Sequence, residues 1–518
     1  MNQVQQTLRD SAFLRWVVLF LISSLLFSTY WFQDFFSGLK GLMESEMGIT
    51  SEEYGQLLGF TTIANVFGMI IVGGYVLDKW GIRLAGAIFG GIATLGALIV
   101  ALGAAGVFGD DKSTQLSVMI AGRILFGTGL EVICVVSTRT VVKWFKGYEL
   151  ALAMAINVGF GRLGSALAIA VSPDIAAGEV LPAVNFAATV VALSMLMFLI
   201  YLIFDIKIDR QQKAINAAGT YCDPEEEFRF SDLLKLITDR SFIYITLLCV
   251  TFYAAVFPFI SYAPDLLVNK FGFSYELPEG QGNLYLMGSA ALGNTAVYLG
   301  MFMFGLAFSL IPARQKNWTG RIVSFGIILT LFVLMIYALS DTLALWLRNG
   351  PKTASLIPLG TILFTPVFGT YVDKKGKAAS LMIIGSFLII FAHLALSVFN
   401  TVALAYAGLI ALGMAFSLVP AAMWPSVAKI VAENRLGTAY ATMFTVQNWG
   451  RGAFFYGIGA VLDLSNKKNL DAIRAGEMMY DYTLPILLLV ACGVVSIYLS
   501  YLLKKADRKQ NYGLELPT

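Results

Sequence analysis

The sequence predicts an all-α protein that crosses a membrane many times. Of its 518 residues, 58% are hydrophobic and only 13% are charged, whereas about 25% of the residues in a typical soluble domain are charged. Apolar runs recur along most of the chain, and a run of about 20 residues is long enough to cross a bilayer as an α-helix. Because backbone polar groups in hydrocarbon must be satisfied within their own segment, these runs are expected to be helices.

Fourteen apolar runs are expected to span the membrane. They lie at about 13–37, 54–77, 84–106, 116–144, 149–171, 180–204, 241–264, 296–312, 322–347, 354–372, 379–399, 401–424, 436–463 and 482–503. Residues 1–205 are predicted to form an N-terminal six-helix bundle and residues 206–240 a polar linker. Residues 241–518 are predicted to form a second six-helix bundle, interrupted at about 276–353 by an inserted hairpin of two helices.

The basic residues predict how the chain lies in the membrane. With the N-terminus inside, 24 of the 36 Lys and Arg residues fall in inside segments and 8 in outside segments. Cytoplasmic loops carry an excess of Lys and Arg, so both termini and the linker are expected in the cytoplasm.

The sequence lacks the motifs of several other classes of protein. It has no G-x-x-x-x-G-K-[S/T] loop, which argues against an ATP-driven pump, and no Cys and His spacing that suits a metal site. It also has no soluble catalytic domain. We therefore expect no enzyme activity, no metal, no cofactor and no nucleic-acid partner.

Two similar loops indicate an internal duplication. GGYVLDKWGIR at 73–83 and FGTYVDKKGK at 368–377 each join a helix end rich in small residues to a tight turn. Matching segments in two halves are typical of carriers built from repeats. We expect these loops to lock the cytoplasmic side shut through Gly74, Asp78, Lys79, Gly81, Arg83, Asp373, Lys374, Gly376 and Lys377.

The loops resemble the signature of the major facilitator superfamily, and RILFGTG at 123–129 resembles its fourth-helix motif. The segments RILFGTGLE, VKWFKGYEL, GRLGS, PVFGTYVDKKGK and MWPSVAKIVAENRLGTAYATMFTVQNWG are similar to the lysosomal dipeptide transporter branch of that superfamily. This resemblance implies two six-helix bundles that expose a central site alternately, and facilitated diffusion of dipeptides.

The chain departs from that branch in three respects. The insertion at about 276–353 is extra, and Arg451 stands where an aliphatic residue is expected. No acidic dileucine signal is evident near the N-terminus. We therefore expect a bacterial-type relative in the cell (inner) membrane rather than the lysosome.

Two charges lie deep in neighbouring predicted helices. Glu131 is near the middle of the run at 116–144, and Arg162 is near the middle of the run at 149–171. Ionisable residues at this depth usually mark a functional site. We expect Glu131 to accept from the ammonium of a dipeptide and Arg162 to hold its carboxylate, which are the roles that the resemblance implies. The alternative is a buried ion pair that only joins the two helices.

Four further candidates lie on other predicted helices. Tyr30 and Asp34 share a helix face and are expected to receive the substrate amine at the outward gate; the alternative is a helix-end Asp at the headgroup level beside an aromatic belt. Tyr253 and Trp424 are expected to line the site, with ordinary packing as the alternative.

A polar stripe on one late helix adds two more candidates. Tyr440, Phe444, Gln447 and Arg451 recur at helical spacing, which argues for a cavity rather than lipid. Arg451 is a second candidate for the substrate carboxylate, and its attraction to Glu131 or Asp34 is expected to close one gate. The alternative is a bridge between the bundles.

The expected function is a dipeptide uniporter that works as a monomer in the lipid bilayer. The first alternative is a proton-coupled symporter or antiporter for another small organic solute, with Glu131 as the titrating group. A remoter alternative is a membrane receptor or scaffold that transports nothing.

Overall fold

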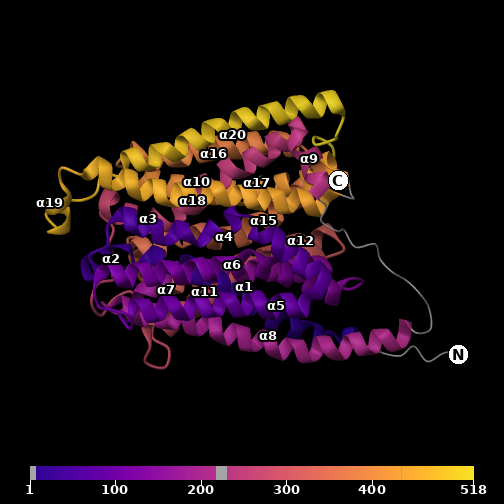
Figure 1. Cartoon of the computed structure of the whole chain (residues 1–518), viewed down its shortest axis with the longest axis horizontal. Helices are drawn as coiled ribbons and strands as arrows, with labels where there is room; N and C mark the ends of the chain where they lie inside the picture. The colour runs from indigo at the N-terminus through magenta and orange to yellow at the C-terminus, as the bar shows by residue number, and fades with distance from the viewer. Residues whose placement is uncertain (1–7, 217–229, 433–434, 518) are drawn as a thin grey trace.

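The computed structural model describes residues 8–216, 230–432 and 435–517. Within these residues the elements are α-helices and short 3-10 turns, with two isolated β-bridges. The helices run side by side along the long axis of the molecule (Figure 1). The prediction of an all-α membrane protein is confirmed.

The first bundle runs from α1 to α8. Its elements are η1 Leu8–Asp10, α1 Ala12–Asp34, η2 Phe35–Gly38, α2 Lys40–Met47, α3 Ser51–Gly59, η3 Phe60–Thr62, α4 Ile63–Val66, α5 Met69–Ala104, α6 Lys112–Phe145, α7 Leu150–Ala176 and α8 Val180–Asn216. Side-chain caps fix several boundaries: Thr50 and Glu53 form a reciprocal capping box at the start of α3. Gly81, with φ 77°, turns the chain inside α5, where one membrane span ends and the next begins.

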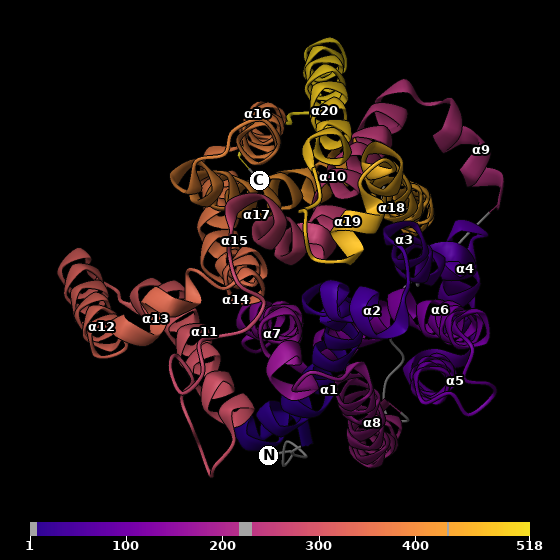
Figure 2. The same cartoon turned by 90° about the vertical axis from the view of Figure 1, so that its left-hand side faces the viewer.

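The second bundle follows the linker and contains the insertion. Its elements are α9 Phe230–Thr238, α10 Arg240–Phe271, α15 Leu356–Lys375, α16 Ala378–Ser397, α17 Val402–Ile430, α18 Leu436–Asn466, α19 Leu470–Arg474 and α20 Thr483–Gln510. The insertion supplies α11 Ala290–Arg314, α12 Trp318–Ala338, α13 Ser340–Trp346 and α14 Gly350–Ala354. Seen from one end, α11 to α13 lie beside the two bundles, with α12 outermost (Figure 2). Only Ile328 of α12 is buried, although Phe325 and Phe332 pack against phenylalanines of α11.

The predicted number of fourteen spans is not confirmed. Among the described residues, twelve helices are long and apolar enough to cross a membrane, or thirteen if the pair Ser51–Val66 and Met69–Leu77, bent by 53°, forms one span. The remaining predicted span, α18, has 31 residues but carries Gln447, Asn448 and Arg451 in its middle. Because this helix lies between the bundles, its polar middle contacts protein rather than lipid.

The two bundles close against each other at one end of the molecule. The described chain begins and ends at the opposite end, whereas α2 and α19 lie at the closed end (Figure 1), which is termed the α2 end. There α3 meets α18 through backbone: a Cβ atom on Gly459 would lie 2.1 Å from the carbonyl oxygen of Ser51, and one on Gly55 would lie 2.6 Å from that of Phe455. Glycine at both positions is therefore required for this contact.

Replacing Gly459 by Ala should loosen the α2 end, because the new methyl group would overlap the Ser51 carbonyl. Over-packing of this kind typically costs about 1–3 kcal/mol, so the melting temperature of the purified protein should fall. The matched control is Gly457→Ala on the same helix, where an added Cβ would meet nothing within 4 Å; its melting temperature should be unchanged or slightly raised. Equal melting temperatures for the two variants would contradict the close contact between α3 and α18.

Candidate functional site

The carboxylate of Glu131 joins the two bundles at mid-depth. Its Oε1 accepts a hydrogen bond from Nη1 of Arg451 at 2.9 Å, and one from Nδ2 of Asn448 at 3.4 Å. Glu131 lies on α6 of the first bundle, and both donors lie on α18 of the second. Glu131 is 8% exposed and Arg451 is 4% exposed, so the pair is shielded from water. Glu131 thus pairs with Arg451 rather than with Arg162, and the alternative of an ion pair between α6 and α7 is not what the structure shows.

Both members of this pair keep an unused edge. Among the described residues, Oε2 of Glu131 accepts no hydrogen bond, since both donors use Oε1. Arg451 uses only Nη1, for Glu131 and for Oδ1 of Asn448 at 3.4 Å, and its buried Nε has no hydrogen-bond partner. Buried polar atoms are nearly always satisfied in folded proteins. The unused edges are therefore positions where a polar ligand or water is expected.

Arg162 has no carboxylate within ion-pair distance in the part of the chain that the structure describes. Its guanidinium carbon lies 4.2 Å from the ring centre of Phe416 on α17, and 5.8 Å from that of Tyr30 on α1. Contact with an aromatic face attracts a cation but does not neutralise it. Because Arg162 is only half-buried, its N–H groups remain available to an anion.

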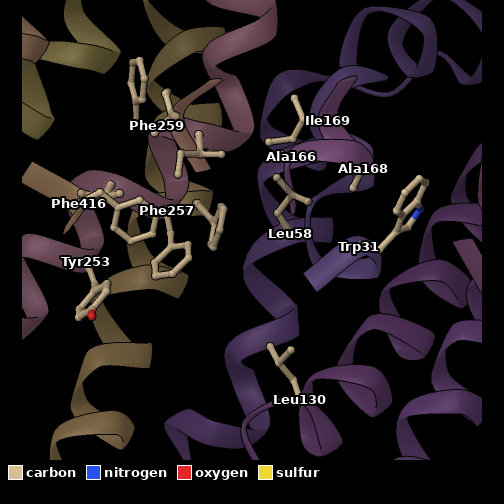
Figure 3. Packing of buried hydrophobic residues seen from close by; sticks show 14 of the residues in the cluster. Trp31, Leu58, Leu130, Ala166, Ala168, Ile169, Tyr253, Phe257, Phe259 and Phe416 are labelled. Atoms are coloured by element: carbon tan, nitrogen blue, oxygen red, sulfur yellow. The ribbon is translucent and has the colours of Figure 1, made fainter. Parts of the chain in front are cut away.

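Aromatic side chains of the second bundle face these charges. Figure 3 shows Tyr253, Phe257 and Phe416 on one side, opposite residues of the first bundle that include Leu130 and Ala166. The guanidinium carbon of Arg451 lies 4.4 Å from the ring centre of Phe257. Phe257 and Phe416 in turn pack edge to face, with ring centres 5.4 Å apart. Arg162 and Arg451 thus lie against one aromatic pair, each over a different ring.

The other aromatic candidates, Tyr253 and Trp424, are joined by a hydrogen bond. Nε1 of Trp424 donates to the hydroxyl of Tyr253 at 3.1 Å, and the Tyr440 hydroxyl donates to the Trp424 carbonyl at 3.2 Å. Trp424 also stacks on Phe444, with ring centres 4.8 Å apart. Gln447 accepts from Sγ of Cys249 at 3.4 Å. These contacts lie within the second bundle and build a wall beside the charged groups.

Asp34 lies at the end of α1 and is enclosed by protein. It is 4% exposed, and its Oδ2 accepts from the hydroxyl of Ser165 on α7. Arg123 of α6, fully buried, donates to the carbonyl oxygens of Phe32 at 2.7 Å and Gln33 at 3.3 Å. These donations satisfy carbonyl groups that the end of a helix leaves unpaired. Arg123 therefore fixes the end of α1, which carries Tyr30 and Asp34.

The first repeated loop is held by carboxylates of α8. Arg83 pairs with Asp209 at 2.7 Å and with Asp205 at 3.5 Å. Gly81 makes the turn with a positive φ that favours glycine. Among the other predicted gating residues, Gly74 is half-buried, Lys79 is exposed, and the side chain of Asp78 lies outside the described residues.

The second repeated loop is held by the C-terminal segment instead. The backbone N–H of Lys377 donates to the carbonyl of Glu515 at 3.1 Å. The Glu515 carboxylate accepts from the backbone N–H of Ser380 at 2.9 Å and from its hydroxyl at 2.7 Å, so it caps α16, which has no cap of its own. Gly376 has φ 68°, and Asp373 and Lys374 precede it at the end of α15. The contacts described for each loop stay within its own bundle, so the predicted gating roles are not visible in this conformation.

Two buried ion pairs at the α2 end were not predicted. Nζ of Lys40 lies 2.8 Å from Asp265 and 2.7 Å from Glu44, and the hydroxyls of Tyr275 and Tyr482 also donate to Asp265. Burial alone would lower the pKa of Lys40, but the charges of Asp265 and Glu44 raise it well above its usual value. The sequence alone does not show that α2 folds back against α10.

The second of these pairs ties the insertion to the first bundle. Lys352 of α14 lies 2.8 Å from Asp174 of α7, and Asn294 of α11 donates to the same carboxylate at 2.8 Å. Two residues that flank or belong to the hairpin therefore share one acceptor on the helix that carries Arg162. Among the described residues, no three His, Cys, Asp or Glu side chains are grouped as a metal site.

Comparisons with known proteins agree on one family. Residues 22–350 match the model of the Major Facilitator Superfamily. The chain is 24% identical over 465 residues to the Lysosomal dipeptide transporter MFSD1 of Danio rerio, which covers 87% of this chain and 81% of that protein. It is 25% identical to the protein of that name from Mus musculus over 457 residues, covering 87% and 80%.

Solved structures share the fold at lower identity. A bacterial homolog of the human lysosomal transporter Spinster, in an inward-facing and unoccupied conformation, aligns with a TM-score of 0.60 at 13% identity, over 96% of this chain and 98% of its own. The nucleoside transporter NupG aligns with a TM-score of 0.58 at 14% identity, over 95% and 99%. These similarities confirm the predicted two-bundle fold.

Replacing Lys40 should strongly destabilise the protein, because the carboxylates of Asp265 and Glu44 would lose the cation that both of them contact. Loss of one partner of a buried pair costs about 3–5 kcal/mol, so Lys40→Met should lower the melting temperature markedly. The double variant Lys40→Met, Asp265→Leu should recover much of that loss.

The pKa of Lys40 is raised in the folded protein. Its pairing therefore contributes fully to the free energy of unfolding below the pKa of the unfolded state, and this contribution is lost only as the pH rises through the higher pKa of the folded state. The effect of Lys40→Met should therefore be the same at pH 6 and pH 8; additive losses in the double variant would contradict the pairing.

Proposed function

The chain belongs to the Major Facilitator Superfamily, and we propose that this multi-pass membrane transporter carries small zwitterionic peptides, principally dipeptides, by facilitated uniport. The single observation that carries the proposal is that the guanidinium of Arg162, at mid-depth, has no carboxylate partner among the described residues. A charge without an ion-pair partner at this depth is energetically costly and usually marks a functional site. Binding the carboxylate end of a substrate supplies the missing partner.

Glu131 supplies the complementary acceptor for the other end of the peptide. Its Oε2 is unused, and it lies on α6, next to α7 in the chain. An ammonium group bound there would share the carboxylate with Arg451 without displacing it. A dipeptide has an ammonium and a carboxylate at a nearly fixed separation along its backbone, so one acceptor and one donor suffice to select it over neutral solutes.

The relatives support the same class of substrate. The proteins that align over 87% of this chain are named dipeptide transporters. The aromatic wall of Tyr253, Phe257 and Trp424 offers apolar contact surface without further charge, which suits peptides with varied side chains.

Alternating access follows from the placement of these groups on two bundles. Glu131 and Arg162 belong to the first bundle, whereas Arg451 and Phe416 belong to the second. A peptide held between them contacts both bundles at once and stabilises the passage between conformations. The structure described is closed at the α2 end. With both termini in the cytoplasm, as the distribution of basic residues suggests, and with the protein in the cell membrane, this is the conformation closed to the outside.

Arg162→Ala should abolish saturable dipeptide uptake into proteoliposomes, because the peptide carboxylate loses its charged donor. A hydrogen bond between charged groups is worth about 1.5–3 kcal/mol, or roughly 10–100-fold in affinity, so the apparent affinity for Ala-Ala should fall by at least that factor. Arg162→Lys should retain part of it. Arg321→Ala, at an exposed position of the hairpin turn, is the matched control and should transport normally. Uptake by Arg162→Ala that equals the wild-type rate would refute the proposed site.

Uniport and proton coupling can be separated in the same vesicles. If the protein is a uniporter, Ala-Ala should equilibrate without changing the lumenal pH, and an imposed pH gradient should not drive accumulation above equilibrium. Lumenal pH is read with an entrapped dye while labelled peptide is counted. Peptide accumulation that follows the pH gradient, and that disappears in Glu131→Gln, would favour the proton-coupled alternative.

A further inference from the structure

The middle of the bundle carries more positive than negative charge. The guanidinium of Arg162 lies 5.8 Å from the ring centre of Tyr30, Arg451 pairs with Glu131, and Arg123 and Asp34 are held at the end of the same helix α1. These groups comprise three cations and two anions. A single uncompensated charge is energetically important here, because electrostatic interactions are much stronger in a protein interior than in water.

The excess positive charge can be assigned to Arg162. Asp34 and Arg123 both lie at the end of α1 and are enclosed by protein, and each is held by local hydrogen bonds. Glu131 and Arg451 form the ion pair between the bundles. Arg162 is the group that remains. A zwitterionic peptide with uncharged side chains brings one charge of each sign and leaves this excess in place.

Arg451 presents a second anion-binding edge beside Arg162. The residue is 4% exposed, its buried Nε has no partner, and both of its described hydrogen bonds use Nη1. A guanidinium binds a carboxylate best through two parallel N–H groups, and Nε with one Nη forms such a pair. One edge of Arg451 thus holds Glu131, and the Nε edge has no hydrogen-bond partner among the described residues.

The two guanidiniums lie over rings that pack against each other. Each lies over one ring of the edge-to-face pair formed by Phe257 and Phe416, at 4.4 Å for Arg451 and 4.2 Å for Arg162. The carboxylates of a dipeptide with an acidic side chain are likewise separated by only a few bonds. The aromatic pair provides the apolar surface between them.

We propose that the transporter prefers dipeptides that carry one acidic side chain, and that Arg451 determines this preference. The ammonium binds Oε2 of Glu131, the terminal carboxylate binds Arg162, and the side-chain carboxylate binds the Nε edge of Arg451. Such a peptide has a net charge of minus one and neutralises the site, whereas a peptide with a basic side chain increases the excess. This inference rests on the proposed dipeptide function and assigns a substrate class to the same site.

The test compares two nearly isosteric peptides that differ in charge. Ala-Glu and Ala-Gln are used as competitors of labelled Ala-Ala uptake into proteoliposomes, with Ala-Lys as the third competitor. In the wild type, Ala-Glu should compete about tenfold or more better than Ala-Gln, and Ala-Lys should compete least. The measured quantity is the ratio of the Ala-Glu and Ala-Gln inhibition constants within one protein sample, so that a loss of folded protein cancels.

Two variants locate the preference at Arg451. Arg451→Gln should bring the ratio to about one, and Arg451→Lys, which keeps a charge but lacks the planar fork, should give an intermediate value. Arg321→Ala on the hairpin turn should keep the wild-type ratio. Equal inhibition by the two peptides in the wild type, or an unchanged ratio in both Arg451 variants, would overturn the inference while leaving dipeptide transport intact. Absence of saturable Ala-Ala uptake by the wild type would instead refute the proposed function, and this inference with it.

Discussion

The rest of the structure depends on the ion pair between Glu131 and Arg451. The two charges belong to different bundles, are 2.9 Å apart and are both buried. Separating them would leave each charge buried alone, which typically costs several kcal/mol. Moving the bundles apart at this depth is therefore costly unless something else satisfies both groups. A ligand that brings an ammonium to Glu131 and a carboxylate to the guanidiniums beside it lowers that cost, so the proposed binding and conformational change would be linked by charge.

The ion pairs at the α2 end also join the bundles, but they differ from the Glu131–Arg451 pair in how easily water can reach them. Lys40 pairs with Asp265, and Lys352 pairs with Asp174, each across the boundary between a first-bundle helix and a second-bundle helix. These groups lie near the ends of their helices, so water that enters as the α2 end opens can hydrate them as they separate. The pair at mid-depth is farther from both ends of its helices. Water can thus replace the contacts at the α2 end more easily than those of Glu131 and Arg451, whose separation a charged ligand would favour.

The sequence allowed the helices and the depth of each charge to be predicted, but it left open which charges meet. The lengths of the apolar runs placed Glu131, Arg162 and Arg451 near the middle of their helices, and the glycines of the two repeated loops placed the turns. Spacing along a helix defines a face, but it does not define which helix of the other bundle that face contacts. For that reason the sequence offered Glu131 both Arg162 and Arg451 as partners, and the structure pairs it with Arg451. Lys40 shows the same limit: a short helix after a predicted span resembles a loop, and only the fold reveals that its side chain is fully buried beside Asp265. The predicted run at 436–463 does form a long helix, α18, but its polar residues between the bundles leave it outside the helices that are apolar enough to cross a membrane.

Arg162 is positioned by close packing of its helix rather than by an opposite charge. A Cβ atom on Gly164 would lie 2.3 Å from the carbonyl oxygen of Phe27, so α7 meets α1 through backbone; on another face of α7, one on Gly159 would lie 3.0 Å from the Phe302 ring of the inserted α11. Asp174, farther along α7, is held by Lys352 and Asn294. Helix contacts on two sides thus fix the backbone of α7 without using the guanidinium. If a carboxylate of the protein had been needed to hold Arg162 in place, that carboxylate would compete with the ligand. Because the packing of α7 supplies the position, the charge of Arg162 stays available, and the inserted hairpin contributes to the site through the helix that carries Arg162 rather than by direct contact with a substrate.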